Sequence, residues 1–211
     1  ENTTLEIELE KNSLNWRPFQ LAFILINIEG LVNPLSTDRK IVDLLWFPTG
    51  GGKTEAYLGI AAFLLGYRRL IASSEDEFER DGGVTILLRY TLRLLTTQQR
   101  DRLLRMICAC EYIRQKKSNL GKSEFSVGFW AGANVTANKL EVLHENQRFR
   151  DSDKVIKEYK KIEKQVIECP CCGSKELEYK FLPDRDTKTK KIGVKIECQN
   201  KSCFFNTSHI P

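Results

Sequence analysis

Residues 47–54, with the sequence Phe-Pro-Thr-Gly-Gly-Gly-Lys-Thr, combine the residue types needed to bind polyphosphate. Glycines let consecutive backbone N–H groups curl around phosphate oxygens without Cβ clashes. Lys53 would place its ammonium group on the outer phosphates, and the Thr54 hydroxyl would ligate Mg²⁺, so both are predicted to serve catalysis. The stretch predicts a site for ATP and Mg²⁺. Its expected contacts are Thr49, Gly50, Gly51, Gly52, Lys53, Thr54 and Glu55.

A second candidate site consists of cysteines spaced as metal ligands. Cys169 and Cys172 form a Cys-x-x-Cys pair, and Cys198 and Cys203 form a Cys-x4-Cys pair. Strand-like runs lie between the pairs, which is the pattern of a zinc ribbon. Four filled positions leave none for water or substrate, so the predicted Zn²⁺ is structural and would supply folding energy to a module with little core.

Two other ligand assignments remain open for this module. Cys171 lies inside the first cysteine pair and could replace a neighbour, and His209 could replace Cys203. The metal prediction therefore specifies two cysteine pairs, with these two residues as alternatives.

A third candidate set follows the apolar run 84–88, where a strand is expected to enter a helix. Arginine and threonine donors, together with the N–H groups at a helix start, bind nucleic-acid backbone without reading bases. The predicted contacts are Arg89, Thr91, Arg93, Thr96 and Gln98. The alternative interpretation is an amphipathic helix with an ordinary basic face.

Gln20 lies upstream of the glycine-rich stretch, after the aromatic Phe19. A glutamine amide donates and accepts at once, which matches the N6/N7 edge of adenine. The segment resembles superfamily 2 proteins, which carry an adenine-reading glutamine upstream of the phosphate loop, and this resemblance implies that Gln20 contacts the nucleotide base. A polar position on a packed helix is the alternative.

The elements that must position these residues alternate between apolar runs and helical patterns. Buried parallel strands are predicted at 41–46, 84–88 and 125–132. Helices are predicted at 15–28, from 55 to 66–69, and from about 90 to 117. The pattern indicates an α/β fold, with strand-like runs at 176–182 and 192–197 in the cysteine module.

Composition is that of an ordinary soluble globular protein. The 211 residues are 41% hydrophobic and 29% charged, and the net charge of +5 is compatible with nucleic acid. No apolar run approaches the ~20 residues that span a bilayer, so no membrane association is expected. Metal-spaced cysteines suit a reducing compartment, which predicts a cytoplasmic protein. The first residue is Glu1, so we expect a piece of a longer protein.

Residues 16–23 and 45–59 resemble superfamily 2 helicases of the DISARM anti-phage type, the DrmA-like helicases. Superfamily 2 helicases in general have Pro-Thr-Gly-x-Gly-Lys-Thr at the phosphate loop, commonly preceded by Ala, where this chain has Phe47. The 90–100 segment is similar to motif Ia, which grips the backbone of one strand, although Tyr90 replaces its proline. The resemblance covers residues 16 to about 100 well and the remainder loosely.

The resemblance implies a RecA-like, ATP-driven motor on DNA, with RNA possible, that works in phage defence beside other defence-system proteins. The implied organisation is an N-terminal helical segment (1–35), a partial RecA-like lobe (36–166) and an inserted or appended zinc ribbon (167–207). The acidic Asp-Glu motif and the second motor lobe of such enzymes are not found in the sequence. We therefore expect residues 1–211 to bind nucleotide weakly without turning it over.

Two other functions fit parts of this pattern. One is a P-loop ATPase outside the helicases, against which the motif Ia-like run argues. The other is a non-enzymatic zinc-ribbon module that binds nucleic acid.

Overall fold

The computed structural model describes residues 15–48, 50–71, 82–89, 93–129, 166–183, 192–206 and 210. The chain forms two compact units, and each is described by itself. The helical unit is Leu9–Ser126, and the ribbon unit combines Glu1–Glu8 with Val127–Pro211.

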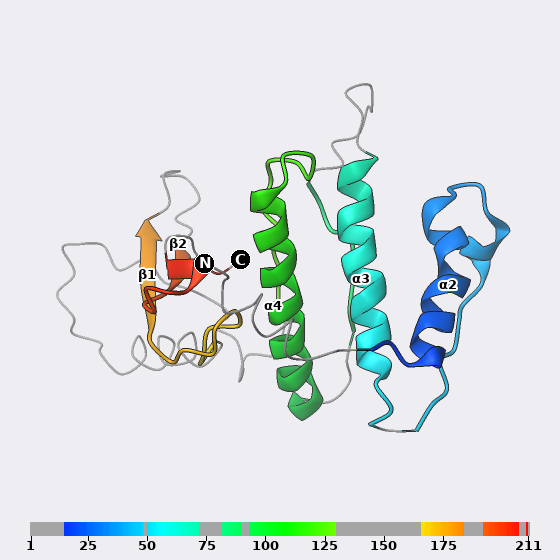
Figure 1. Cartoon of the computed structure of the whole chain (residues 1–211), viewed down its shortest axis with the longest axis horizontal. Helices are drawn as coiled ribbons and strands as arrows, with labels where there is room; N and C mark the ends of the chain where they lie inside the picture. The colour runs from blue at the N-terminus through cyan, green and yellow to red at the C-terminus, as the bar shows by residue number, and fades with distance from the viewer. Residues whose placement is uncertain are drawn as a thin grey trace. The chain divides into compact units, whose positions relative to one another are not determined.

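Three long helices build the helical unit (Figure 1). They are α2 (Pro18–Val32), α3 (Lys53–Leu70) and α4 (Arg93–Lys116), with a short 3₁₀ helix, η1 (Thr37–Lys40), after α2. Helix α3 packs against α2 on one side and α4 on the other, as Figure 1 shows. The three predicted helices are confirmed, with their ends shifted by a few residues. No described helix has both the length and the apolarity to cross a bilayer.

Local signals explain the ends of α2. Pro18 occupies the first turn, where its missing N–H costs nothing, and the side-chain oxygen of Gln20 accepts from the Arg17 N–H at 2.9 Å. The helix continues through Gly30 to Val32, past the end predicted at residue 28. The Arg39 side chain donates to the Gly30 carbonyl at 2.9 Å and ties η1 to this part of α2.

Small residues on α3 allow close helix packing. Ala56 and Ala61 are buried, and Gly59 lies against the neighbouring segment. A Cβ atom at Gly59 would come within 2.7 Å of the Trp16 ring and 3.0 Å of Ile24 Cδ1. The close approach of residue 16 and α2 to α3 therefore requires glycine at this position.

A buried carboxylate organises the C-terminal half of α4. Glu111 is 2% exposed and accepts two hydrogen bonds from the Arg114 guanidinium, at 2.7 and 2.5 Å. It also accepts from the Gln115 side chain and from the backbone N–H of Phe125, each at 2.9 Å. The Phe125 ring is itself buried and lies under the Arg69 guanidinium, 4.7 Å from its carbon. Glu111 thus fastens the 125 segment to α4.

The predicted buried parallel strands are not seen among the residues that the structure describes. Segments 41–48, 84–89 and 125–129 have no regular secondary structure and belong to no described sheet. Val42 is 93% exposed, Trp46 85% and Leu87 87%. Apolar composition makes a strand only where a neighbouring strand pairs its backbone and a covering layer buries its side chains. Among the described residues neither is present for the first two segments.

The described sheet belongs to the ribbon unit. Strands β1 (Leu177–Pro183) and β2 (Ile192–Cys198) pair antiparallel, with Leu177 opposite Cys198 and Pro183 opposite Ile192. The short helix η2 (Phe204–Asn206) follows. Buried Phe205 and Ile210, together with three of the cysteines, form the small interior of this unit. The two strand-like runs predicted for the cysteine module are confirmed.

Candidate functional sites

The glycine-rich loop at the start of α3 has a backbone that depends on glycine. Gly50 and Gly52 have φ angles of +82° and +93°, a left-handed region that other residues rarely adopt. Gly52 caps α3, and the Gly51 N–H donates to the Pro48 carbonyl at 3.2 Å. The loop therefore turns tightly into the helix and brings the N–H groups of its first turn to the loop end of α3.

The Lys53 side chain turns back across this loop. Its ammonium group donates to the carbonyl of Phe47 and lies 3.4 Å from that of Pro48. Thr54 follows in the first turn of α3 and is half-buried. A positive charge and a hydroxyl are thus held beside the glycine backbone, an arrangement that could bind polyphosphate and a divalent cation.

The start of α2 contacts the loop directly. The Arg17 guanidinium donates to the Gly51 carbonyl at 2.8 Å, and the Gln20 amide donates to the Gly52 carbonyl at 2.7 Å. Gln20 is 5% exposed, and its oxygen accepts from the Arg17 N–H. Both polar ends of the residue predicted to contact adenine therefore engage the chain's own backbone.

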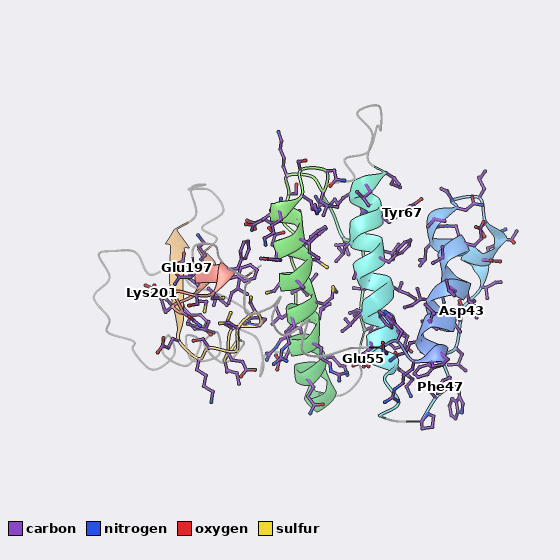
Figure 2. All side chains as sticks on the ribbon, viewed as in Figure 1. Asp43, Phe47, Glu55, Tyr67, Glu197 and Lys201 are labelled. Atoms are coloured by element: carbon purple, nitrogen blue, oxygen red, sulfur yellow. The ribbon has the colours of Figure 1, made fainter. Side chains whose placement is uncertain are left out.

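An aromatic pair lies at the entrance to the loop. The rings of Phe19 and Phe47 stack with centroids 4.0 Å apart and planes 21° apart. Phe47 takes the place of the first glycine in the general motif and remains 40% exposed; Figure 2 shows it in the chain segment leading to α3. The ring thus fastens the loop to α2 rather than lining its glycine turn.

Glu55 joins the loop to α4. Its carboxylate forms an ion pair with Arg102 at 2.9 Å, and Figure 2 shows it on the first turn of α3. Its other oxygen is buried and has no hydrogen-bond partner among the described residues. This oxygen lies 3.3 Å from where a Cβ atom of Gly52 would stand. Glu55 is thus close to the loop backbone and also connected to the next helix.

The predicted nucleic-acid contacts are only partly described. Arg89 is exposed at the end of its extended segment, Arg93 and Thr96 belong to the first turns of α4, and Gln98 is exposed on the same helix. Thr91, like Thr49 of the loop, lies outside the described residues. The structure therefore brings three of these five residues onto one helix.

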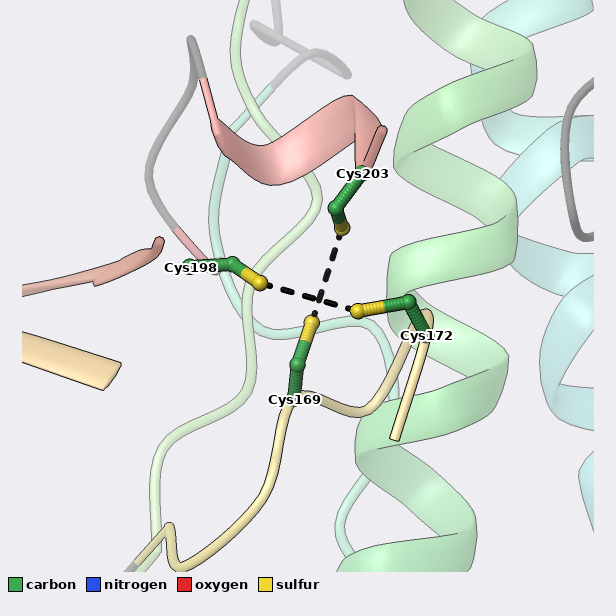
Figure 3. A group of neighbouring side chains, drawn as sticks. All are labelled: Cys169, Cys172, Cys198 and Cys203. Atoms are coloured by element: carbon green, nitrogen blue, oxygen red, sulfur yellow. Dashed lines mark hydrogen bonds between the residues drawn. The ribbon is translucent and has the colours of Figure 1, made fainter. Parts of the chain in front are cut away.

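The ribbon unit gathers four sulfur atoms around one point. Figure 3 shows Cys169, Cys172, Cys198 and Cys203 directed at a common centre. Their sulfur atoms all lie within 4.8 Å of one another, and two of the separations are 3.7 and 3.6 Å. A tetrahedron with Zn–S bonds of about 2.3 Å has S–S edges of about 3.8 Å. The four thiols therefore fit a tetrahedral metal ion.

Backbone turns hold these sulfurs in place. The Gly173 N–H donates to the Cys169 carbonyl at 2.8 Å, and Gly173 has a φ of +72° that closes the first turn. The N–H groups of Cys171 and Cys172 hydrogen-bond toward the Cys169 sulfur. The side-chain amide of Asn200 donates to the Cys172 sulfur at 3.7 Å. These donors would stabilise thiolate charge once a metal displaced the protons.

Burial controls the charge of the thiols. It raises the pKa of Cys169 to about 12, and it also raises that of Cys203. Burial acts in the same direction on Cys172, but hydrogen bonds from Ser174 and the neighbouring thiols outweigh it and lower that pKa. The lowered pKa of Cys172 favours its thiolate, whereas metal binding must release the protons of Cys169 and Cys203.

The two alternative metal ligands have different positions. Cys171 is not a member of the four-sulfur cluster, and His209 lies outside the described residues. The contacts of Arg17, Phe47 and Arg102 were not anticipated. The spacing of Arg17 and Gln20, that of a capping box, marks the start of α2 but does not signal the contact of Arg17 with Gly51.

The chain is similar to a known protein over almost its whole length. It is 76% identical, over 209 residues and 99% of its own length, to "DISARM protein DrmA" of Bacillus paralicheniformis, and it spans 19% of that protein's length. No family model matches the chain, and no solved structure matches it.

Proposed function

We propose that the chain, which is 76% identical to a DrmA protein of DISARM, is part of a DrmA-like protein and contributes the ATP-binding part of a superfamily 2 motor that acts on DNA in anti-phage defence. The assignment to defence follows the similarity of the whole chain to DrmA. Nucleotide binding and DNA binding are part of this proposal, and RNA is the alternative nucleic acid on which the motor would act. Other proteins of the same defence system are the expected partners.

The loop at the start of α3 is the observation that carries the proposal. Left-handed glycines at 50 and 52 let the backbone curl, and Lys53 and Thr54 stand at the helix start. When bound there, Mg²⁺ would neutralise phosphate charge. The chain's own groups would hold the nucleotide: N–H groups and the Lys53 ammonium bind phosphate oxygens, and the Thr54 hydroxyl faces the cation.

A RecA-like lobe is the fold that best accounts for the order of elements. Extended apolar segments at 41–48 and 84–89 precede α3 and α4, which is the strand-to-helix order of a parallel α/β unit. The exposed side chains of Val42, Trp46 and Leu87 are what such strands bury when a sheet surrounds them. We propose that residues 36–166 contribute to this lobe.

A zinc ion is proposed for the four-cysteine cluster. Four thiols at tetrahedral spacing favour Zn²⁺ over oxygen-seeking cations such as Mg²⁺. The ion would hold together a unit whose interior contains few buried side chains.

DNA-stimulated ATP hydrolysis by the intact protein tests the main proposal. Lys53→Ala should abolish hydrolysis and weaken ATP binding, because it removes the ammonium group beside the loop. Lys40→Ala removes an exposed lysine from η1 and is the matched control. Hydrolysis that is unaffected by Lys53→Ala would refute the assignment of this loop. Hydrolysis that depends on Lys53 but not on nucleic acid would favour an ATPase outside the helicases.

A further inference from the structure

We propose that Arg17 and Gln20 are positioning residues that fix the orientation of two peptide groups in the phosphate loop. The inference rests on the proposed nucleotide-binding role of residues 47–54. Its basis is a pair of contacts from the start of α2. Arg17 donates to the Gly51 carbonyl at 2.8 Å, and Gln20 donates to the Gly52 carbonyl at 2.7 Å.

The planar geometry of the peptide group determines where the N–H groups that follow these two carbonyls point. In a trans peptide the C=O and the following N–H point in opposite directions. Holding the Gly51 carbonyl toward Arg17 therefore directs the Gly52 N–H away from Arg17. Holding the Gly52 carbonyl toward Gln20 likewise directs the Lys53 N–H away from α2. N–H groups at a helix start lack intrahelical partners, so these two are available to phosphate oxygens.

Gln20 is itself held in one orientation. Its oxygen accepts from the Arg17 N–H at 2.9 Å, while its nitrogen reaches the Gly52 carbonyl. A flipped amide would set oxygen against carbonyl and nitrogen against N–H, and would lose both hydrogen bonds. Because Gln20 is 5% exposed, water cannot readily replace either partner. The helix start thus transmits a fixed geometry to the loop.

Gly52 is shaped for this contact. A Cβ atom at this position would lie 2.6 Å from the Gln20 nitrogen, and the φ of +93° already disfavours other residues. The close approach of the amide and the left-handed backbone therefore depend on the same glycine.

The role makes a prediction that separates it from recognition of adenine. Residues that orient phosphate-binding N–H groups act on the triphosphate, which ATP and GTP share. A residue that reads the adenine edge acts on ATP alone. The ratio of the two affinities therefore distinguishes the roles.

The test measures Kd for Mg·ATP and Mg·GTP in the intact protein. Gln20→Met keeps the length of the side chain and removes both hydrogen bonds. We expect both nucleotides to bind about fivefold to tenfold more weakly, with an unchanged ratio, as for the loss of one buried hydrogen bond, because only the bond to the Gly52 carbonyl reaches the loop. Amide exchange in the nucleotide-free loop should become faster. Asn27→Leu is the control, because the Asn27 amide donates to the Phe23 carbonyl at 2.8 Å on the same helix, away from the loop.

A second variant keeps the test valid if Gln20→Met destabilises the fold. Arg17 is exposed, so Arg17→Met should leave the unfolding temperature unchanged. The same variant should weaken the binding of both Mg·ATP and Mg·GTP and speed amide exchange in the loop. Arg17→Lys, which keeps a donor, should restore most of the affinity. Arg39→Met is the matched control, because Arg39 donates to a glycine carbonyl at 2.9 Å elsewhere, that of Gly30.

Three outcomes would overturn the positioning role. A loss confined to ATP in Gln20→Met makes this residue a base reader. Affinity and loop exchange that are unchanged in both the Gln20 and Arg17 variants, while Lys53→Ala weakens binding, refute the positioning role alone. Binding that Lys53→Ala leaves unchanged refutes the nucleotide site, and the positioning role with it.

Discussion

The buried carboxylate of Glu111 allows a prediction whose size follows from its contacts. Glu111→Gln keeps the shape of the side chain but removes its charge and sets an N–H₂ group among donors. Arg114, whose side chain is 11% exposed, would lose a bidentate ionic partner at 2.7 and 2.5 Å. Breaking a buried pair by removing one partner costs about 3–5 kcal/mol, and the retained amide oxygen places this case near 3 kcal/mol.

Amide hydrogen exchange of the intact protein measures this loss locally. A change of about 3 kcal/mol corresponds to roughly 100-fold faster exchange where local opening limits it. We expect this faster exchange in peptides from the C-terminal half of α4 and from the segment around Phe125. The backbone N–H of Phe125 donates to the Glu111 carboxylate at 2.9 Å. Peptides from α2 should be unaffected.

A matched substitution controls for the change from Glu to Gln. Glu29 accepts from the Asn33 side chain at 2.8 Å, but this contact is exposed on α2. Glu29→Gln should alter the opening free energy obtained from amide exchange by no more than about 0.5 kcal/mol, as is usual for surface positions. If Glu111→Gln accelerates exchange no more than Glu29→Gln does, the carboxylate does not hold α4 to the 125 segment.

The remaining predictions concern pH, packing, the loop and the metal. Burial opposes the charge of Glu111, but hydrogen bonds from Arg114, Gln115 and Phe125 outweigh it and lower its pKa below the ordinary 4.5. The stabilisation of the fold by the Glu111 carboxylate is therefore complete above about pH 4.5 and is lost as pH falls through the lowered pKa. Amide exchange of α4 measured along an acid titration would show this loss. Gly66→Ala, whose Cβ meets open space, should raise the unfolding free energy by about 1 kcal/mol, whereas Gly59→Ala should not, because its Cβ would lie 2.7 Å from Trp16; equal gains in thermal unfolding would contradict this packing. Gly52→Ala should weaken Mg·ATP binding at least as much as Gln20→Met, since it disturbs both the left-handed backbone and the Gln20 contact; calorimetric titration measures it, and unchanged affinity would exclude the described loop geometry. Cys198→Ser should release one equivalent of bound zinc and unfold the ribbon unit, while Cys171→Ser, outside the cluster, should retain the metal; zinc content and ribbon exchange after chelation report both, and zinc loss from Cys171→Ser would revise the ligand set.

Features encoded by neighbouring residues were predictable from the sequence. Pro18 and the spacing of Arg17 and Gln20 mark the start of α2, and the glycines before Lys53 mark the start of α3. The cysteine pairs predicted two turns facing each other across a hairpin, because each turn is built within a few residues. These signals are local, so they hold whatever surrounds the segment.

Features that depend on distant partners were not predictable. The apolar residues Val42, Trp46 and Leu87 predicted burial, but burial requires a neighbouring strand, and the described residues provide none. The chain spans 19% of the length of its DrmA relative. The stacking of Phe19 on Phe47 depends in the same way on how α2 approaches the loop.

Segments 41–48 and 84–89 also bear on how the isolated chain would behave in solution. Each presents exposed apolar side chains on a backbone that belongs to no described sheet. Extended apolar segments with free backbone donors and acceptors are templates for pairing between molecules. Concentrated preparations of residues 1–211 should therefore self-associate through these segments. Single charged substitutions, such as Val42→Lys and Leu87→Lys, would improve solubility without touching the glycine-rich loop or the cysteine cluster.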